Sequence, residues 1–198
     1  MSSVDLTGLP EHDSQMIPVT FGGMSQSPLG GAATYIRRLG DRWSMQVTTA
    51  AMRMEPDGRR WSARLTRGSR NGVVLPIDLE GFDPGLVGAP AIASDTRSGC
   101  VLPLAGLHAN YVVREGQWLS IIHGGRRVHT DQVVAQVAAD GSGNATIEVH
   151  NLLRSALRAG DVVELGKPMI EGLFKDVVPI PRPLEGFPSF TFTIVEDV

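Results

Sequence analysis

The segment from Tyr111 to Leu165 constrains the fold of this chain more than any other. Apolar and polar residues alternate along it in short stretches, separated by clusters of glycine, aspartate and asparagine. His123-Gly124-Gly125 and the stretch 140–144 (DGSGN) are typical of hairpin turns, because these residues adopt left-handed backbone conformations readily. The pattern predicts a small β module with strands over 118–122, 128–138 and 145–149.

Two further strands are predicted outside that segment. From Arg42 to Ala50 the apolar residues Trp43, Met45 and Val47 fall on one face of an alternating pattern. The last residues, 189–196, alternate in the same way. The two stretches match in length and aromatic character, so we expect them to pair with each other.

One helix is predicted over Pro56–Arg67. Proline suits the first helical position, and Trp61 and Leu65 stand four residues apart and share a face. Gly68 is placed to end the helix in the left-handed conformation. A second, two-turn helix is a weaker possibility over 152–159.

These elements predict a mainly β fold in two parts. Residues 1–31 are rich in serine, glycine and proline and lack a period, which indicates an N-terminal arm, with a possible edge strand over 17–21. Residues 32–78 and 176–198 are expected to form one β domain with the helix. Residues 79–175 are expected to form an inserted β-barrel or sandwich.

Composition excludes several function classes. The net charge of −3 and the absence of a basic run argue against nucleic-acid binding. No apolar run approaches the length needed to span a membrane, and Met1–Pro10 lacks the features of a signal peptide. Cys100 is the single cysteine, so no intramolecular disulfide forms and we expect the chain to fold in a reducing cytoplasm.

No residue pattern predicts catalysis. Phosphate loops, dinucleotide fingerprints and nucleophile elbows are missing from the sequence. His123, His129 and His150 could approach one another, but solvated turns and cross-strand packing explain them more simply than a metal site. Asp78, Glu80 and Asp83 are best explained as a solvated turn rather than a calcium site. We therefore expect no enzyme activity, cofactor or metal.

Other residues are candidates for binding. Arg59, Arg60, Arg64 and Arg67 form a basic helix face, which is either solvated or paired with a neighbouring subunit. The unpaired edge of a strand needs a partner. The strands predicted over 42–50 and 189–196 therefore add four candidates for a subunit interface: Arg42, Trp43, Phe190 and Phe192. Tyr111, Trp118 and His123 are candidates for a shallow ligand groove.

The order of these pieces resembles the small minor tail proteins, or distal tail proteins, of long-tailed bacteriophages. The resemblance covers about 43–198 and is carried by an ordered set of stretches: 61–65 closed by Gly68, 87–90, 99–104, 114–121, 127–129, 137–149, 152–154 and 160–163. It implies a tube-like β domain with one helix that builds a ring, commonly a hexamer, and an outer inserted β module.

The same resemblance implies partners and location. The ring would join the tail tube to the hub at the virion tail tip, and it would assemble in the host cytoplasm with other tail-tip proteins. Nucleic acid would only pass through it, and no membrane is involved. The alternative is a β module that binds a carbohydrate or receptor at a tail tip or cell surface.

Overall fold

A computed structural model describes residues 3–79, 81–184 and 186–197, and they form a mainly β fold, as predicted. The helical elements are a π-helical turn, η1 (Met54–Gly58), and the helix α1 (Arg59–Asn71). The strands are β1 (Val4–Asp5), β2 (His12–Val19), β3 (Gly23–Ser25), β4 (Thr34–Ile36), β5 (Arg42–Thr49), β6 (Val73–Pro76), β7 (Gly88–Ile92), β8 (Val101–Leu107), β9 (Val112–Val113), β10 (Trp118–His123), β11 (Arg126–Gln132), β12 (Val137–Ala138), β13 (Ala145–Glu148), β14 (Val162–Glu164), β15 (Met169–Phe174) and β16 (Thr191–Glu196).

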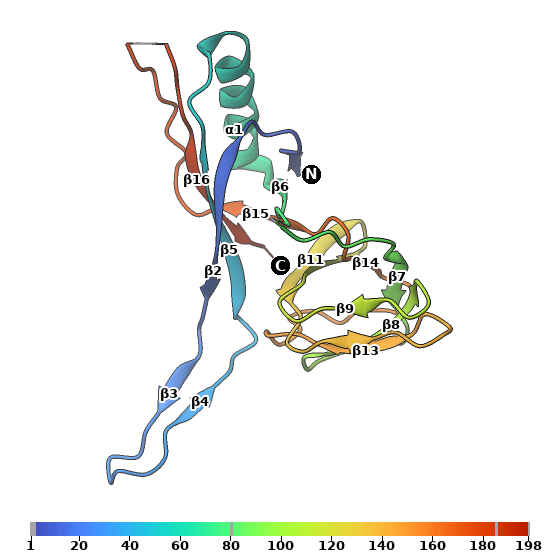
Figure 1. Ribbon diagram of the computed structural model, residues 1–198. Coiled ribbons are helices and arrows are strands. Elements are labelled where there is room, and N and C mark those ends of the chain that lie inside the picture. Colours follow the sequence, from blue (N-terminus) through green and yellow to red (C-terminus); the bar gives the residue numbers. More distant parts are fainter. Residues whose placement is uncertain (1–2, 80, 185, 198) are drawn as a thin grey trace.

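The first sheet is built from both ends of the chain, in the order β1-β6-β15-β16-β5-β2. The pairing predicted between residues 42–50 and 189–196 is confirmed at the centre of this sheet. β16 runs antiparallel to β5, with Phe192 opposite Val47 and Ile194 opposite Met45. Figure 1 shows this sheet upright, with α1 beside its upper half and the inserted unit beside its lower half.

A single apolar core holds α1 against the first sheet. Trp61 and Leu65 are buried on one face of the helix, where the four-residue spacing placed them. They belong to the same cluster as Phe190, Phe192 and Ile194 of the C-terminal segment.

The predicted end of the helix is wrong by one turn. Gly68 lies within α1 and is buried, and the chain leaves the helix at Gly72, which has φ 78°. A Cβ atom at position 68 would lie 2.4 Å from Cγ1 of Val73, so this glycine serves close packing of the helix on β6.

The inserted unit is a six-stranded sheet, in the order β11-β10-β14-β7-β8-β13, which curls into a half-barrel. Its separate core draws on residues from Val87 to Leu165. The turn after His123 joins β10 and β11 as a hairpin, as predicted.

Two local predictions within this unit are wrong. The strand predicted over 128–138 is divided into β11, which ends at Gln132, and the short β12, which pairs with β9. β13 pairs with β8, and the predicted hairpin is reduced to a bridge between Val133 and Val149. No helix forms over 152–159, because Leu153 and Leu157 are both drawn into the barrel core along an irregular path.

The boundaries between the parts also differ from the prediction. β15, expected in the inserted unit, lies in the first sheet between β6 and β16. The predicted arm begins as part of that sheet too, because β1 pairs with β6 and the whole of β2 pairs with β5. Pro18 is tolerated in β2 because this strand is an edge of the sheet.

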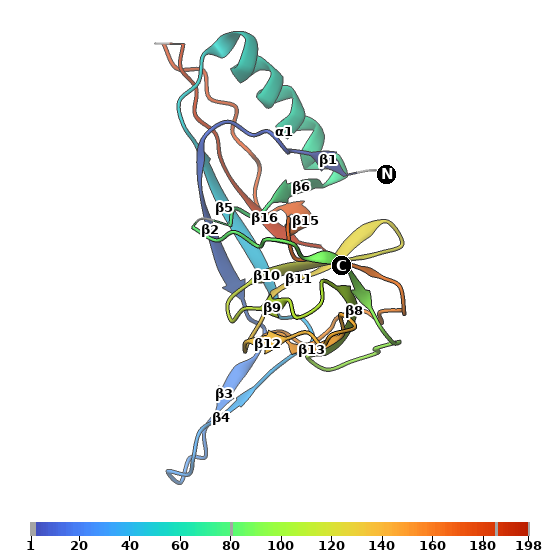
Figure 2. The ribbon, with the colours of Figure 1, turned by 45° about the vertical axis from the view of Figure 1, so that its right-hand side comes forward.

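What projects from the body is a β-hairpin formed by β3 and β4. It continues from the ends of β2 and β5 beyond both sheets, and Figure 2 shows the same projection after rotation. The hairpin thus includes the second half of the predicted arm and the beginning of the predicted ring-forming domain.

Candidate interaction surfaces

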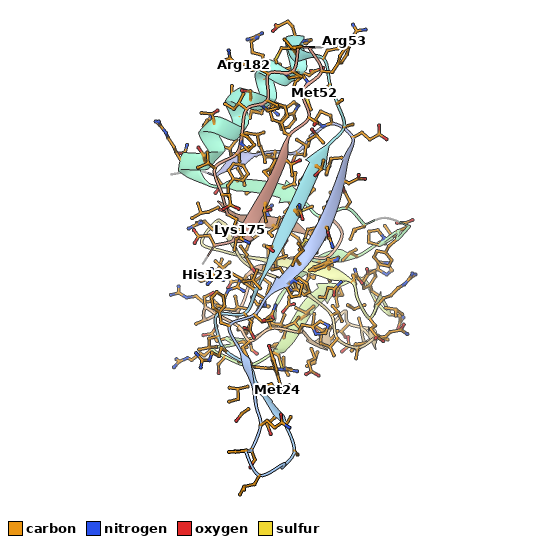
Figure 3. The ribbon with its side chains drawn as sticks, turned by 90° about the vertical axis from the view of Figure 1, so that its left-hand side faces the viewer. Met24, Met52, Arg53, His123, Lys175 and Arg182 are labelled. Carbon is orange, nitrogen blue, oxygen red and sulfur yellow. The ribbon has the colours of Figure 1, made fainter. Side chains whose placement is uncertain are left out.

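The hairpin presents large apolar side chains to solvent. β3 and β4 pair through three residues on each strand, with Met24 opposite Tyr35. Met24 is 72% exposed and points away from the ribbon in Figure 3, and Leu29 near the tip is 96% exposed. The other exposed apolar residues of this segment are Phe21, Tyr35, Ile36 and Leu39. Exposed apolar side chains gathered on one projecting segment are typical of a binding site.

The base of the hairpin is held by Asp41. Its buried carboxylate accepts hydrogen bonds from the backbone N–H groups of Phe21, at 2.7 Å, and Gly22, at 3.3 Å. A Cβ atom on Gly22 would lie 2.4 Å from the carbonyl oxygen of Ile36, so the two strands approach too closely here for any larger residue. These contacts define the direction in which the hairpin leaves the body.

Next to the base of the hairpin, a buried ion pair joins the first sheet to the inserted unit. The guanidinium of Arg154, from the inserted unit, contacts the carboxylate of Glu196 on β16. It also donates a hydrogen bond of 3.0 Å to the carbonyl oxygen of Asp41. Glu196 is fully buried and accepts the backbone N–H of Thr130 at 2.6 Å.

Two tryptophans lie at the same junction. Trp43 and Trp118 meet edge to face, with ring centroids 4.8 Å apart. The indole N–H of Trp43 donates to the buried carboxylate of Asp131 at 2.8 Å. Trp43, which is partly buried, therefore joins β5 to the inserted unit within one chain.

Glu171 on β15 forms a third link. Its carboxylate accepts the backbone N–H of Arg127 at 2.9 Å, the hydroxyl of Ser3 at 2.6 Å and the guanidinium of Arg126 at 3.2 Å. Burial by itself raises the pKa of this carboxyl group, but the three donors outweigh burial and lower its pKa below the usual value.

Two of the predicted interface residues are buried. Phe190 and Phe192 are 1% and 4% exposed, because they pack in the core between the first sheet and α1. β16 also has no free edge, since it lies between β15 and β5. β5 is internal as well, since β2 covers its outer side. Arg42 is partly buried at the base of the hairpin, with its guanidinium 5.4 Å from the ring centroid of Phe21.

The four arginines predicted on α1 are all exposed, so they remain interface candidates. Arg59 pairs with Glu55 of the preceding turn at 2.7 Å, and Arg64 lies over the ring of Trp61 at 4.7 Å. The side chains of Arg60 and Arg67 form no hydrogen bond or ion pair within the described part of the chain.

The residues predicted to line a ligand groove do not converge. Trp118 and His123 stand at opposite ends of β10, about 16 Å apart for a regular strand. The His123 ring contacts the Asp161 carboxylate at 2.9 Å. The Tyr111 hydroxyl accepts a hydrogen bond from the side-chain amide of Gln117, and its ring packs against the inserted core.

Trp118 does line a groove of about 480 Å³, which neither Tyr111 nor His123 lines. The groove lies between β2, the segment after β6 and the residues that lead into β10. Half-buried apolar side chains of Met16, Leu79 and Phe82 contribute to it, and Asp78 and Glu115 provide carboxylates. Sequence reasoning missed this groove because its residues come from three distant segments.

A second exposed apolar surface lies at the end of the first sheet opposite the hairpin. Backbone hydrogen bonds from Met52 to Pro188 and from Met54 to Gly186 extend the chain there. Figure 3 shows Met52, Arg53 and Arg182 at this end and Met24 at the other. The chain between Lys175 and Pro188, which reaches this end, carries the exposed apolar residues Val177, Ile180, Leu184 and Phe187.

The remaining candidate groups form no reactive cluster within the described ranges. No set of three or more potential metal ligands comes together there. His129 is buried beside Asp131, whereas His150 is exposed. Of the predicted acidic cluster, Asp78 contacts His12 at 3.2 Å, Asp83 is exposed, and Glu80 lies outside the described residues.

Cys100 is half-buried. Its thiol lies 3.5 Å from the Glu148 carboxylate, and burial raises the pKa of the thiol. No helix in the described ranges has both the length and the apolar character needed to cross a membrane.

No protein-family model matches the chain, and no curated protein matches it at a significant level.

Proposed function

We propose that this chain is a structural subunit that assembles with copies of itself into a ring, in the manner of the distal tail proteins that its sequence resembles. The ring would sit at the virion tail tip and join the tail tube to the hub. The observation that carries this proposal is the hairpin with exposed apolar side chains that projects from the body of the molecule.

The hairpin has little to stabilise it within its own chain. A two-stranded ribbon is marginally stable in water at best, and burial of apolar surface is what usually orders one. Six large apolar side chains of residues 20–40 remain exposed. Docking on another protein would bury them, at about 25 cal/mol per Å² of apolar surface removed from water.

A second copy of the chain is the simplest partner for such a projection. When a projecting element of one subunit binds a different surface of the next, the contact is heterologous, and it closes into a ring where the rotation permits. The exposed apolar surface at the opposite end, over 177–187, would then remain for other tail proteins.

The test is the oligomeric state of the purified full-length chain, measured by size-exclusion chromatography with light scattering and by negative-stain electron microscopy. We expect rings, with a mass near six times the 21.2 kDa chain if the ring is a hexamer. A variant in which an Asn-Gly turn replaces residues 22–37 should be a folded monomer, because β2 and β5 are then joined directly.

Circular dichroism and the thermal transition of the shortened variant control for folding. A wild-type chain that stays monomeric at all accessible concentrations would overturn the proposal. Unchanged rings after removal of the hairpin would remove its principal support.

A further inference from the structure

We propose that the groove between β2 and the start of β10 receives the β3–β4 hairpin of a second copy of this chain. This inference rests on the proposed self-assembly and adds the acceptor surface. It concerns two surfaces of the same chain that do not meet within one molecule.

The shape and chemistry of the groove suit an apolar ribbon. Met16, Leu79 and Phe82 are half-buried at its wall, so each keeps apolar surface in contact with water. Trp118 adds an aromatic surface at the junction of the two units. Side chains such as Met24 and Tyr35 present the complementary apolar surface on the hairpin.

The charges of the two surfaces are complementary. Residues 20–40 contain two arginines, Arg37 and Arg38, and no acidic residue. The groove carries Asp78, whose side chain is 42% exposed, and the exposed Glu115. Its one cation, Arg114, stacks over the ring of Phe82 at 5.0 Å. Opposite charges of this kind favour the correct partner and speed association.

The groove also borders an open strand. β2 pairs with β5 on one side and is the edge of the first sheet as described. An incoming strand can add to such an edge through backbone hydrogen bonds while its side chains fill adjacent pockets. A β-ribbon therefore fits this place better than a compact ligand does.

A chain cannot fill its own groove with its own hairpin. Figures 1 and 2 show that the hairpin continues past the end of β2, away from the strand that borders the groove. The Asp41 contacts at its base hold that direction. A hairpin that binds in this groove must therefore come from another copy.

A charge-swap experiment tests the pairing. Arg37→Glu with Arg38→Glu, or Asp78→Arg with Glu115→Arg, should each raise the apparent dissociation constant of the assembly at least about tenfold, because like charges then face each other. Mixing the two double variants should restore assembly, because a ring of six that alternates them has three charge-swapped and three wild-type contacts, all between opposite charges. The decisive protein is the quadruple variant, which carries the swapped charges at every contact. It should regain most of the wild-type affinity.

Asp176→Arg, at an exposed site outside the groove, is the matched control and should assemble normally. A photoreactive amino acid at position 24 gives a second readout, in which we expect cross-links to peptides containing 77–82 or 114–118 of another chain. Cross-links confined to other surfaces would overturn the inference.

The outcomes separate this inference from the proposed function. If the shortened hairpin abolishes rings but the groove variants assemble like wild type, the acceptor assignment is wrong and ring assembly by the hairpin stands. If glycan-array binding is lost in Asp78→Arg while assembly is unaffected, the groove is a sugar site and the inference fails. A wild-type monomer would overturn both.

Discussion

At the scale of single residues, the two units are joined by buried polar groups. Breaking a buried ion pair by removing one partner typically costs about 3–5 kcal/mol, because the remaining charge is left without compensation. Arg154 and Glu196 form such a pair, and Arg154 also reaches the backbone at the base of the hairpin. The pair therefore couples the inserted unit, β16 and the hairpin.

Glu171 makes this junction sensitive to acid. Its pKa in the folded chain lies below the ordinary value of 4.5, so the folded state binds its proton less readily than the unfolded state does. The stability that it contributes is complete above the unfolded pKa and is lost as pH falls through the folded pKa. We expect Glu171→Gln to flatten the decline in unfolding free energy below about pH 4.5.

Urea unfolding between pH 3 and 7 measures this effect, and Asp176→Asn controls for the loss of one negative charge. The same slope for wild type and Glu171→Gln would show that the three hydrogen bonds to Glu171 do not contribute to stability.

At the scale of secondary structure, α1 shows how packing overrides a local signal. Glycine followed by polar residues predicts a helix end at position 68, yet the helix continues to Asn71. At Gly68, Val73 of β6 and the ring of Phe174 of β15 occupy the space that a side chain would need. This close contact leaves room for no residue larger than glycine at position 68 of the helix.

We therefore expect Gly68→Ala to destabilise the fold, although alanine is the better helix former. The gain in helix propensity is about 1 kcal/mol, whereas overpacking a tight contact costs about 1–3 kcal/mol. Thermal unfolding measures the net effect. In a Val73→Ala background the cost of Gly68→Ala should shrink, because the contacted methyl group is gone; a stabilised single variant would contradict the expectation.

At the scale of the whole molecule, the first sheet depends on segments that are distant in the sequence. β16 supplies Phe192 and Ile194 to its core and lies between β15 and β5. The inserted unit, in contrast, builds its core from the continuous stretch between Val87 and Leu165. Loss of β16 should therefore destabilise the first sheet far more than the inserted unit.

Removal of Ser189–Val198 is expected to unfold the first sheet instead of merely separating subunits. Limited proteolysis with mass spectrometry should then degrade both ends of the chain and leave a resistant fragment close to 87–165. Equal protection of the first sheet in the truncated and full-length chains would show that β16 is dispensable for the fold.

Much of the architecture could be predicted from local patterns. Alternation identified β5, β10 and β16, and the shared length and aromatic character of two segments identified the pairing of β16 with β5. The apolar hairpin could have been recognised too, since Phe21, Tyr35 and Ile36 flank the turn-forming residues Pro28, Gly30 and Gly31. The absence of a clear period indicated an arm instead.

The sequence by itself determined the mainly β class, the helix and several strands, because side-chain periodicity and turn residues act within a few neighbouring positions. Tertiary structure decided the rest. The place of β15 in the first sheet, the burial of Phe190 and Phe192 and the ion pair of Arg154 with Glu196 could not be predicted. All three depend on which segments, distant in the sequence, come into contact. The groove beside β2 exists for the same reason, since its walls come together only when both units are folded.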